Sequence, residues 1–95
     1  MREKLLVIGI DLDGFLCEGD AWNPKQCLKA KPIEKNIALA NELYEKNFTV
    51  IFTSRRDPLL PATLEWLRRN NIQWCAISNK KTPCDLYYDD RCQKF

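Results

Sequence analysis

The chain of 95 residues contains no histidine. This absence excludes hydrolases in which histidine activates a serine or a cysteine, and it excludes zinc proteases of the H-E-x-x-H type. None of the three glycines precedes a Lys-Ser or Lys-Thr pair, so a P-loop is excluded as well. No cysteine has an arginine six positions after it, as the loop of thiol phosphatases would require. The groups that remain for catalysis are carboxylates, lysine, arginine and hydroxyls.

Long apolar runs and a strong net charge are also missing. No apolar run is long enough to cross a bilayer, and the basic start of the chain leads into acidic residues without a small-residue cleavage site. The formal net charge of +2 is too small to favour a nucleic acid or a membrane as partner. We therefore expect a cytoplasmic protein without membrane contact, for which nucleic acid is the less favoured partner but stays open.

The five cysteines are an odd number and include no C-x-x-C pair. Because no secretory signal precedes them, reduced thiols are the expected state. Cys17 and Cys27 fall in one irregular segment, where a disulfide or a metal site is an alternative, although the usual zinc spacings are missing.

Apolar segments alternate with amphipathic ones along the chain. Four short apolar or β-branched segments are predicted as strands, namely Leu5–Ile10, Phe48–Phe52, Ile72–Ile77 and Leu86–Tyr88. Helical periodicity is found at about 61–70 and at 32–46, where Pro32 is predicted as the first helical residue and Asn47 as the cap. Strands that alternate with helices indicate βαβ units, a parallel sheet and a single α/β domain of residues 1–95.

Polar side chains follow three of these predicted strands. They are Asp11 and Asp13 after the first strand, Thr53 and Ser54 after the second, and Asp89 and Asp90 after the fourth. Lys81 lies just before the fourth strand. Since the carboxyl ends of parallel strands meet at one edge of the sheet, we expect these residues to converge there. Gathered carboxylates repel one another, and a divalent cation with a phosphorylated substrate would offset that repulsion, so magnesium-dependent phosphoryl transfer is the leading hypothesis.

These residues, in this order, resemble the motifs of the haloacid dehalogenase-like (HAD) phosphohydrolase superfamily. The first motif is matched by Asp11-Leu12-Asp13-Gly14 and the second by the strand that ends in Thr53. The third is matched by Lys81, with Lys80 as its rival, and the fourth by Asp89-Asp90. The resemblance covers nearly the whole chain. The phrases IFTSRRD and KTPCDLYYDDR look most like small capless members that serve capsule or surface-polysaccharide synthesis.

The resemblance implies a three-layer, Rossmann-like parallel sheet without a cap domain, and it implies a catalytic role for each motif. Asp11 would attack phosphorus and form an aspartyl-phosphate, while Asp13 would protonate the leaving oxygen and then activate water. Lys81 would offset the charge of the nucleophile and of the transferred group. The phosphate would be bound by Gly14, Thr53, Ser54 and Lys81.

The resemblance also implies a magnesium ion. Its ligands would be Asp11, the backbone carbonyl of Asp13 and Asp89, while Asp90 would either bind the ion or orient its waters. Together these groups make a hard oxygen site. Arg55 and Arg56 come directly after the second motif, and they are either contacts to an anionic substrate or exposed loop arginines.

The chain departs from the family pattern at two points. Phe15 replaces the usual Thr or Val after the motif glycine, and only five residues follow Asp90, so that the usual fifth strand is missing. Residues 14–32, where larger relatives insert a cap domain, have room for a helical turn and a flap only. An open site would take a macromolecular substrate or be enclosed by a second copy of the chain in a homo-oligomer. The aromatic residues that could line such a contact are Trp22, Trp66 and Trp74, although Trp74, on a predicted strand, is expected rather in the core.

These expectations lead to a magnesium-dependent phosphomonoester hydrolase that acts on a sugar phosphate or another small phosphorylated metabolite. Two alternatives stay open. One is the removal of a terminal phosphate from a polynucleotide, which an uncapped site would admit. The other is a non-catalytic binding or regulatory module of the same fold, which Phe15 and the early end of the chain favour.

Overall fold

The computed structural model describes residues 5–19 and 21–89, and in this part of the chain four strands form one sheet. Each neighbouring pair is parallel, and the strand order is β3-β2-β1-β4. The strands are β1 (Val7–Asp11), β2 (Phe48–Phe52), β3 (Ala76–Ser78) and β4 (Leu86–Tyr88). The parallel α/β sheet predicted from the sequence is therefore confirmed.

Three α-helices and one 3-10 turn join the strands within the described residues. These are α1 (Pro24–Lys29), α2 (Glu34–Lys46), the 3-10 turn Asp57–Leu59 and α3 (Leu60–Arg69). Asn47 caps α2 as predicted, and its backbone N–H and its side-chain Nδ2 both donate to the Leu43 carbonyl. No helix in this part of the chain has both the length and the apolar character needed to cross a bilayer.

The predicted start of α2 and the predicted bounds of β3 are wrong. Pro32 pairs with Cys17 in an isolated bridge, which ties this residue to the loop after β1, and the helix begins only at Glu34. β3 begins at Ala76 rather than at Ile72, because Ile72 packs in the core directly after α3 and is only 4% exposed. An apolar run alone does not distinguish such a buried connection from a strand.

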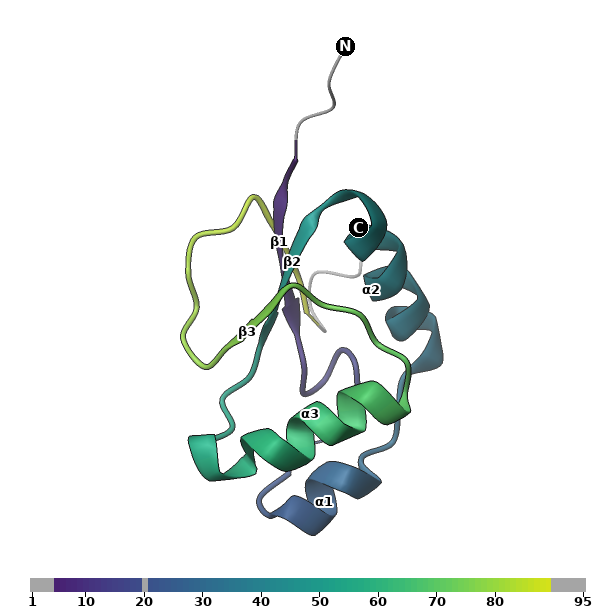
Figure 1. Ribbon diagram of the computed structural model, residues 1–95, viewed down its shortest axis with the longest axis vertical. Helices are drawn as coiled ribbons and strands as arrows, with labels where there is room; N and C mark the ends of the chain where they lie inside the picture. Colours follow the sequence, from purple (N-terminus) through teal and green to yellow (C-terminus); the bar gives the residue numbers. More distant parts are fainter. Residues whose placement is uncertain (1–4, 20, 90–95) are drawn as a thin grey trace.

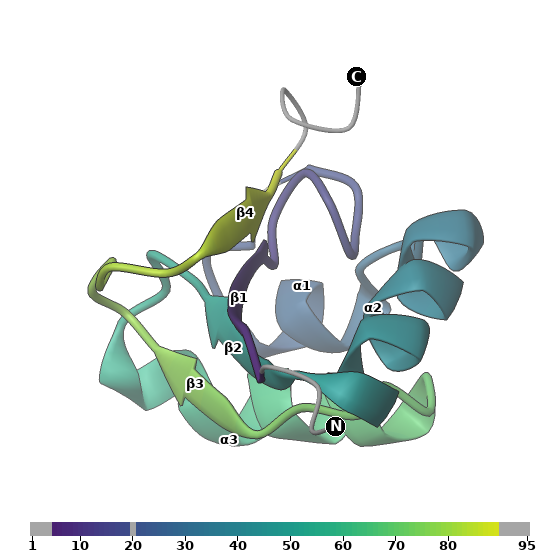
Figure 2. The ribbon, with the colours of Figure 1, turned by 90° about the horizontal axis from the view of Figure 1, so that it is seen from above.

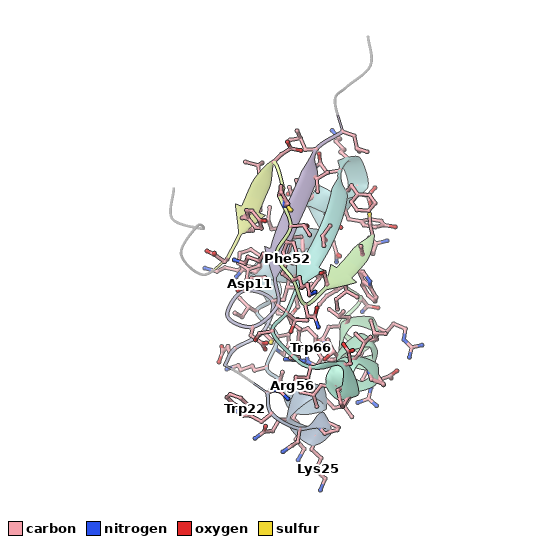
Figure 3. All side chains as sticks on the ribbon, turned by 90° about the vertical axis from the view of Figure 1, so that its left-hand side faces the viewer. Asp11, Trp22, Lys25, Phe52, Arg56 and Trp66 are labelled. Atoms are coloured by element: carbon pink, nitrogen blue, oxygen red, sulfur yellow. The ribbon has the colours of Figure 1, made fainter. Side chains whose placement is uncertain are left out.

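The helices and the loop 79–85 lie on different sides of the sheet. Figure 1 shows α2 beside the strands and α3 crossing near their carboxyl ends, with α1 below it. Viewed from above, the loop between β3 and β4 lies on the side of the strands that faces away from α2 (Figure 2). Figure 3 looks onto this second face of the sheet. The described residues therefore give an α/β sheet with its helices packed on one face, without showing the three-layer arrangement.

The core fills the space between the sheet and the helices. Ile8 and Ile10 of β1 are buried on this face, because every second side chain of a strand points to the same side. They belong to one cluster with residues of β2, α2 and α3, namely Ile51, Ile37, Ala40, Trp66 and Leu67. Trp66 is 1% exposed and its Nε1 donates to the Ala30 carbonyl, so it is a core residue and does not line a surface contact.

Gly9 lies in the middle of β1, where two aromatic rings meet above the second face of the sheet. The ring centroids of Phe52 and Tyr87 are 5.8 Å apart. A Cβ atom at Gly9 would lie 2.7 Å from Phe52 Cε2 and 2.8 Å from Tyr87 Cδ1, which is closer than carbon atoms approach in proteins. Glycine at this position therefore lets both rings pack directly on the strand.

We expect Gly9→Ala to lower the free energy of unfolding by about 1–3 kcal/mol, because the added methyl group overpacks this face. Urea unfolding followed by circular dichroism measures the change. In a Tyr87→Leu background the same substitution should cost less, since one of the two crowding rings is gone. A Gly9→Ala variant as stable as the parent chain would contradict the close approach of the rings.

Candidate active site at the carboxyl edge of the sheet

The loop after β1 is folded tightly by backbone hydrogen bonds. The N–H of Leu12 donates to the Phe52 carbonyl at 2.9 Å, which extends the pairing of β1 with β2. The Leu12 carbonyl in turn accepts hydrogen bonds from the N–H groups of Leu16 and Cys17. Gly14 has a φ of 95°, in the left-handed region that favours glycine, and its N–H donates to the Cys17 carbonyl. Gly14, predicted as a phosphate contact, thus closes the turn.

A cavity of about 250 Å³ opens where β1 and β2 end. Its lining residues are Asp11, Asp13, Phe52, Thr53, Ser54, Asn79 and Lys81. All of these except Phe52 and Asn79 are site residues that the sequence singled out, and they come from separate stretches of the chain. Figure 3 shows Asp11 and Phe52 beside one another at the ends of their strands, where their Cα atoms are paired in register. The structure therefore brings these predicted residues to one hollow.

Asn79 also lines this cavity, although the sequence analysis missed it. It is the first residue after β3, a position equivalent to that of Thr53 after β2. A polar residue directly after a strand was the available signal, but the third strand was predicted to end at Ile77, whereas it ends at Ser78 and Asn79 follows it. Its side-chain amide can donate to an oxyanion, as the hydroxyls of the cavity can.

The two lysine candidates differ in their surroundings. Lys81 lines the cavity, and its Nζ lies 5.3 Å from the centroid of the Tyr87 ring, within the range of a cation–π interaction. The neighbouring Lys80 is tied by its backbone to Ser78, whose Oγ accepts from the Lys80 N–H and donates to the Lys80 carbonyl. Of the two candidates, it is therefore Lys81 that lines the cavity.

Arg55 is buried, so the expectation of an exposed loop arginine is wrong, while its contact with an anionic substrate stays a prediction. Its side chain is 3% exposed and pairs with Asp13, whose side chain is 15% exposed. Nη2 donates to Asp13 Oδ1 at 2.7 Å and Nε donates to Oδ2 at 3.3 Å. Nη1 donates to the Thr63 hydroxyl of α3 at 3.0 Å.

This ion pair links Asp13 of the first predicted motif to the loop that follows the second. Burial acts to lower the pKa of Arg55, but the hydrogen bonds and the charge of Asp13 outweigh it, so the pKa is raised above its usual value. The guanidinium is therefore charged at every physiological pH, and it holds both carboxylate oxygens of Asp13. By contrast, Arg56 is exposed.

Cys17 completes this buried cluster as a neutral thiol. Its Sγ donates to Asp13 Oδ1 at 3.5 Å and accepts from Arg55 Nη2 at 3.7 Å. Burial and the adjacent charge of Asp13 raise the pKa of the thiol from 9.0 to about 12. A group with this pKa is protonated at neutral pH and is a poor nucleophile. Cys17 and Cys27 are both buried, free thiols.

Of the second acidic pair, Asp89-Asp90, the structure describes only Asp89. β1 and β4 are paired so that Ile10 lies beside Tyr88. The residues that follow these two along the chain are Asp11, the last residue of β1, and Asp89, directly after β4. These two carboxylates therefore leave adjacent strands at the same level, but Asp89 does not line the cavity. Asp90 lies outside the described residues. Within residues 5–19 and 21–89, no group of three or more His, Cys, Asp or Glu side chains is arranged to hold a metal ion.

The sequence matches no protein-family model and no curated protein. A solved structure with a similar fold is that of a conserved protein coded by a locus from Bacteroides thetaiotaomicron. It is 23% identical to this chain, the match covers 93% of this chain and 78% of that one, and the TM-score is 0.70. A likeness at this level of identity shows the fold alone.

Proposed function

We propose that the chain is a magnesium-dependent phosphomonoester hydrolase of the capless HAD type that works through an aspartyl-phosphate. The observation that supports this most is the cavity of about 250 Å³ in which Asp11, Asp13, Thr53 and Lys81 meet. Two carboxylates, a hydroxyl and an ammonium group in one open hollow are the groups that phosphoryl transfer to a carboxylate requires. The resemblance of the motifs to the HAD superfamily points to the same reaction.

Each side chain has a chemical role in this proposal. Asp11 attacks phosphorus, and the bond from phosphorus to the leaving oxygen breaks as Asp13 gives that oxygen a proton. Asp13 then takes a proton from the water that cleaves the aspartyl-phosphate. Thr53 Oγ1 accepts the N–H of Arg55 at 3.1 Å, which leaves its own hydroxyl proton free to donate to a phosphate oxygen. Lys81 stabilises the negative charge of the transferred group.

The donor set suits a hard divalent cation. Two described carboxylates at this edge, Asp11 and Asp89, offer oxygen ligands, and the chain has no histidine to favour zinc. Asp11 and Asp89 would hold the ion, joined by Asp90 and the Asp13 carbonyl on the family pattern. When bound, the ion would neutralise charge on the phosphoryl group.

The strand order also supports the HAD-like interpretation. In the order β3-β2-β1-β4 the chain adds β2 and β3 on one side of β1 and then crosses to add β4 on its other side. Ligands of such sheets bind outside the carboxyl ends of the strands at this switch point. Asp11 lies at the end of β1 at the switch point. We include in the proposal a three-layer, Rossmann-like family fold, a cytoplasmic location, a flap at 14–32 and a second copy of the chain that encloses the open site.

One observation favours a second candidate, a non-catalytic binding module. Asp13 is already held on both oxygens by Arg55, and a carboxylate in such a pair is less available to move a proton. The unusual Phe15 favours neither candidate, since it is fully buried and its ring packs 6.2 Å from that of Tyr88. Phe15 is therefore accounted for by the core.

Hydrolysis of para-nitrophenyl phosphate with and without Mg²⁺ tests the proposal. We expect turnover in the presence of Mg²⁺, a loss of at least about a hundredfold in EDTA, and recovery when excess Mg²⁺ is added. Equal rates in EDTA and Mg²⁺ would contradict the metal assignment. If a broad panel of phosphomonoesters is not hydrolysed in Mg²⁺, the binding module is the better interpretation.

A further inference from the structure

A second hollow lies directly beside the proposed phosphate cavity. Its volume is about 370 Å³, and it is lined by Asp13, Ala21, Trp22, Ser54, Arg55, Arg56, Pro58 and Leu59. Asp13 and Ser54 line both hollows, so the two spaces adjoin at these residues. The volume is at the small end of the range for small-molecule sites, which suits a group of the size of a monosaccharide.

Asp13 lines both hollows, which is the position that a general acid needs. A general acid must lie between the group that is transferred and the group that leaves, because it protonates the oxygen that joins them. With the phosphate beside Asp11, the leaving group would extend past Asp13 into the second hollow. A third hollow of about 220 Å³ shares Thr53 and Asn79 with the proposed phosphate cavity, but Asp13 does not line it, so it fits this requirement less well.

Trp22 gives the second hollow an aromatic wall. It is 78% exposed, so its ring is open to a ligand, and its backbone is held in place. The Trp22 N–H donates to Gln26 Oε1 at 2.6 Å, and Asn23 Oδ1 accepts the N–H of Gln26 to cap α1. Figure 3 shows Trp22 and Arg56 beyond the ends of the strands, on the same side as Asp11.

Arg56 gives the same hollow a positive charge. Unlike its neighbour Arg55, it is exposed and forms no ion pair with any residue of the described chain. A guanidinium binds a carboxylate or a phosphate through two parallel hydrogen bonds, so it is suited to a second acidic group on the ligand. Pro58 and Leu59 add apolar surface beside it.

We propose that this hollow is the leaving-group site, and that it takes a sugar ring which carries a second acidic group. The apolar face of the ring packs on Trp22, and the acidic group pairs with Arg56. This inference rests on the proposed function, because it needs the phosphate to occupy the cavity beside Asp11. It goes further by assigning the substrate class and by giving roles to two residues outside the motifs.

Three phosphomonoesters test the assignment by steady-state kinetics. They are glucuronic acid 1-phosphate, which has a ring and a carboxylate, glucose 1-phosphate, which has a ring only, and glycerol 3-phosphate, which has neither. We expect Trp22→Ala to lower kcat/KM for both ring compounds about tenfold relative to glycerol 3-phosphate. Arg56→Gln should lower kcat/KM about tenfold for glucuronic acid 1-phosphate relative to glucose 1-phosphate.

Matched controls separate these effects from general damage. Trp22→Phe keeps an aromatic face and should restore most of the preference for ring compounds. Phe48→Ala removes an exposed aromatic residue at the amino end of β2, and Arg68→Gln removes an exposed arginine of α3. Neither control should change the ratios between the three compounds. If Trp22→Ala and Arg56→Gln leave these ratios unchanged, the assignment of the leaving-group site is wrong.

A binding measurement keeps this test separate from that of the proposed function. Trp22 is far more exposed than Trp66, so its emission should respond when a ring covers it. In an Asp11→Asn variant we expect a saturable change in tryptophan emission with glucuronic acid 1-phosphate and none with glycerol 3-phosphate. If the parent chain hydrolyses none of the compounds but this change occurs, the hollow binds the sugar ring and the hydrolase proposal fails. If hydrolysis occurs without the change, the site assignment fails.

Discussion

Replacement of Asp11 by asparagine is expected to lower kcat for phosphomonoester hydrolysis by at least about a thousandfold. An amide oxygen is too poor a nucleophile to attack phosphorus, while the size and shape of the side chain are kept. Asp11 ends β1 and lines the proposed phosphate cavity, so in the proposed mechanism its replacement removes the nucleophile itself. Steady-state kinetics with para-nitrophenyl phosphate in Mg²⁺ measures the loss.

Two further measurements make this result specific. Acid-quenched parent protein should carry covalent phosphate by mass spectrometry during turnover, and the Asp11→Asn variant should carry none. Glu45→Gln is the matched control, because it also converts an acid into an amide but lies on an exposed position of α2. If Asp11→Asn keeps more than about a tenth of the parental activity, another group is the nucleophile.

Arg55→Met is expected to have the largest effect on stability, a loss of about 3–5 kcal/mol in the free energy of unfolding. The substitution leaves the mostly buried carboxylate of Asp13 without its charged partner. It also removes the hydrogen bond from Nη1 to the hydroxyl of Thr63, a buried residue of α3. Methionine fills much of the same volume, so the cost comes from the unpaired polar groups rather than from a cavity.

Urea unfolding followed by circular dichroism measures this loss, and the chain offers a close control. Arg56→Met makes the same chemical change one residue later at an exposed position, and it should change stability by no more than about 0.5 kcal/mol. The double variant Arg55→Met with Asp13→Asn should recover part of the loss, because no buried charge is left unpaired. Equal stability of the two single methionine variants would rule out a buried ion pair at Arg55.

The convergence of the site could be predicted from the sequence because it depends on topology. Strands that run parallel end at the same edge of the sheet, so residues that follow them are neighbours however far apart they are in the chain. Asp11, Thr53 and Lys81 line one cavity for this reason. The elements with a strong apolar or helical pattern, such as β2 and β4, also have their predicted bounds.

The contacts of individual side chains could not be predicted in this way. Arg55 follows a strand just as Thr53 does, but the turn of the loop directs its side chain inward to Asp13, 42 residues away in the chain. No local pattern carries that information, and an arginine in a loop is usually exposed. Asn79 was missed because the apolar run from Ile72 serves first as a buried connection and only then as β3.

The close approach of two rings at Gly9 has a consequence at the mouth of the site. Lys81 Nζ lies over the ring of Tyr87, and that ring rests on the backbone of Gly9 beside Phe52. The strand interior, an aromatic ring and the ammonium group thus form a stack three layers deep. A single methyl group in the middle of β1 would lift the ring and displace a charge that it never touches. The missing side chain at Gly9 therefore lets the Tyr87 ring lie close to the sheet, with the proposed phosphate-binding cation over it.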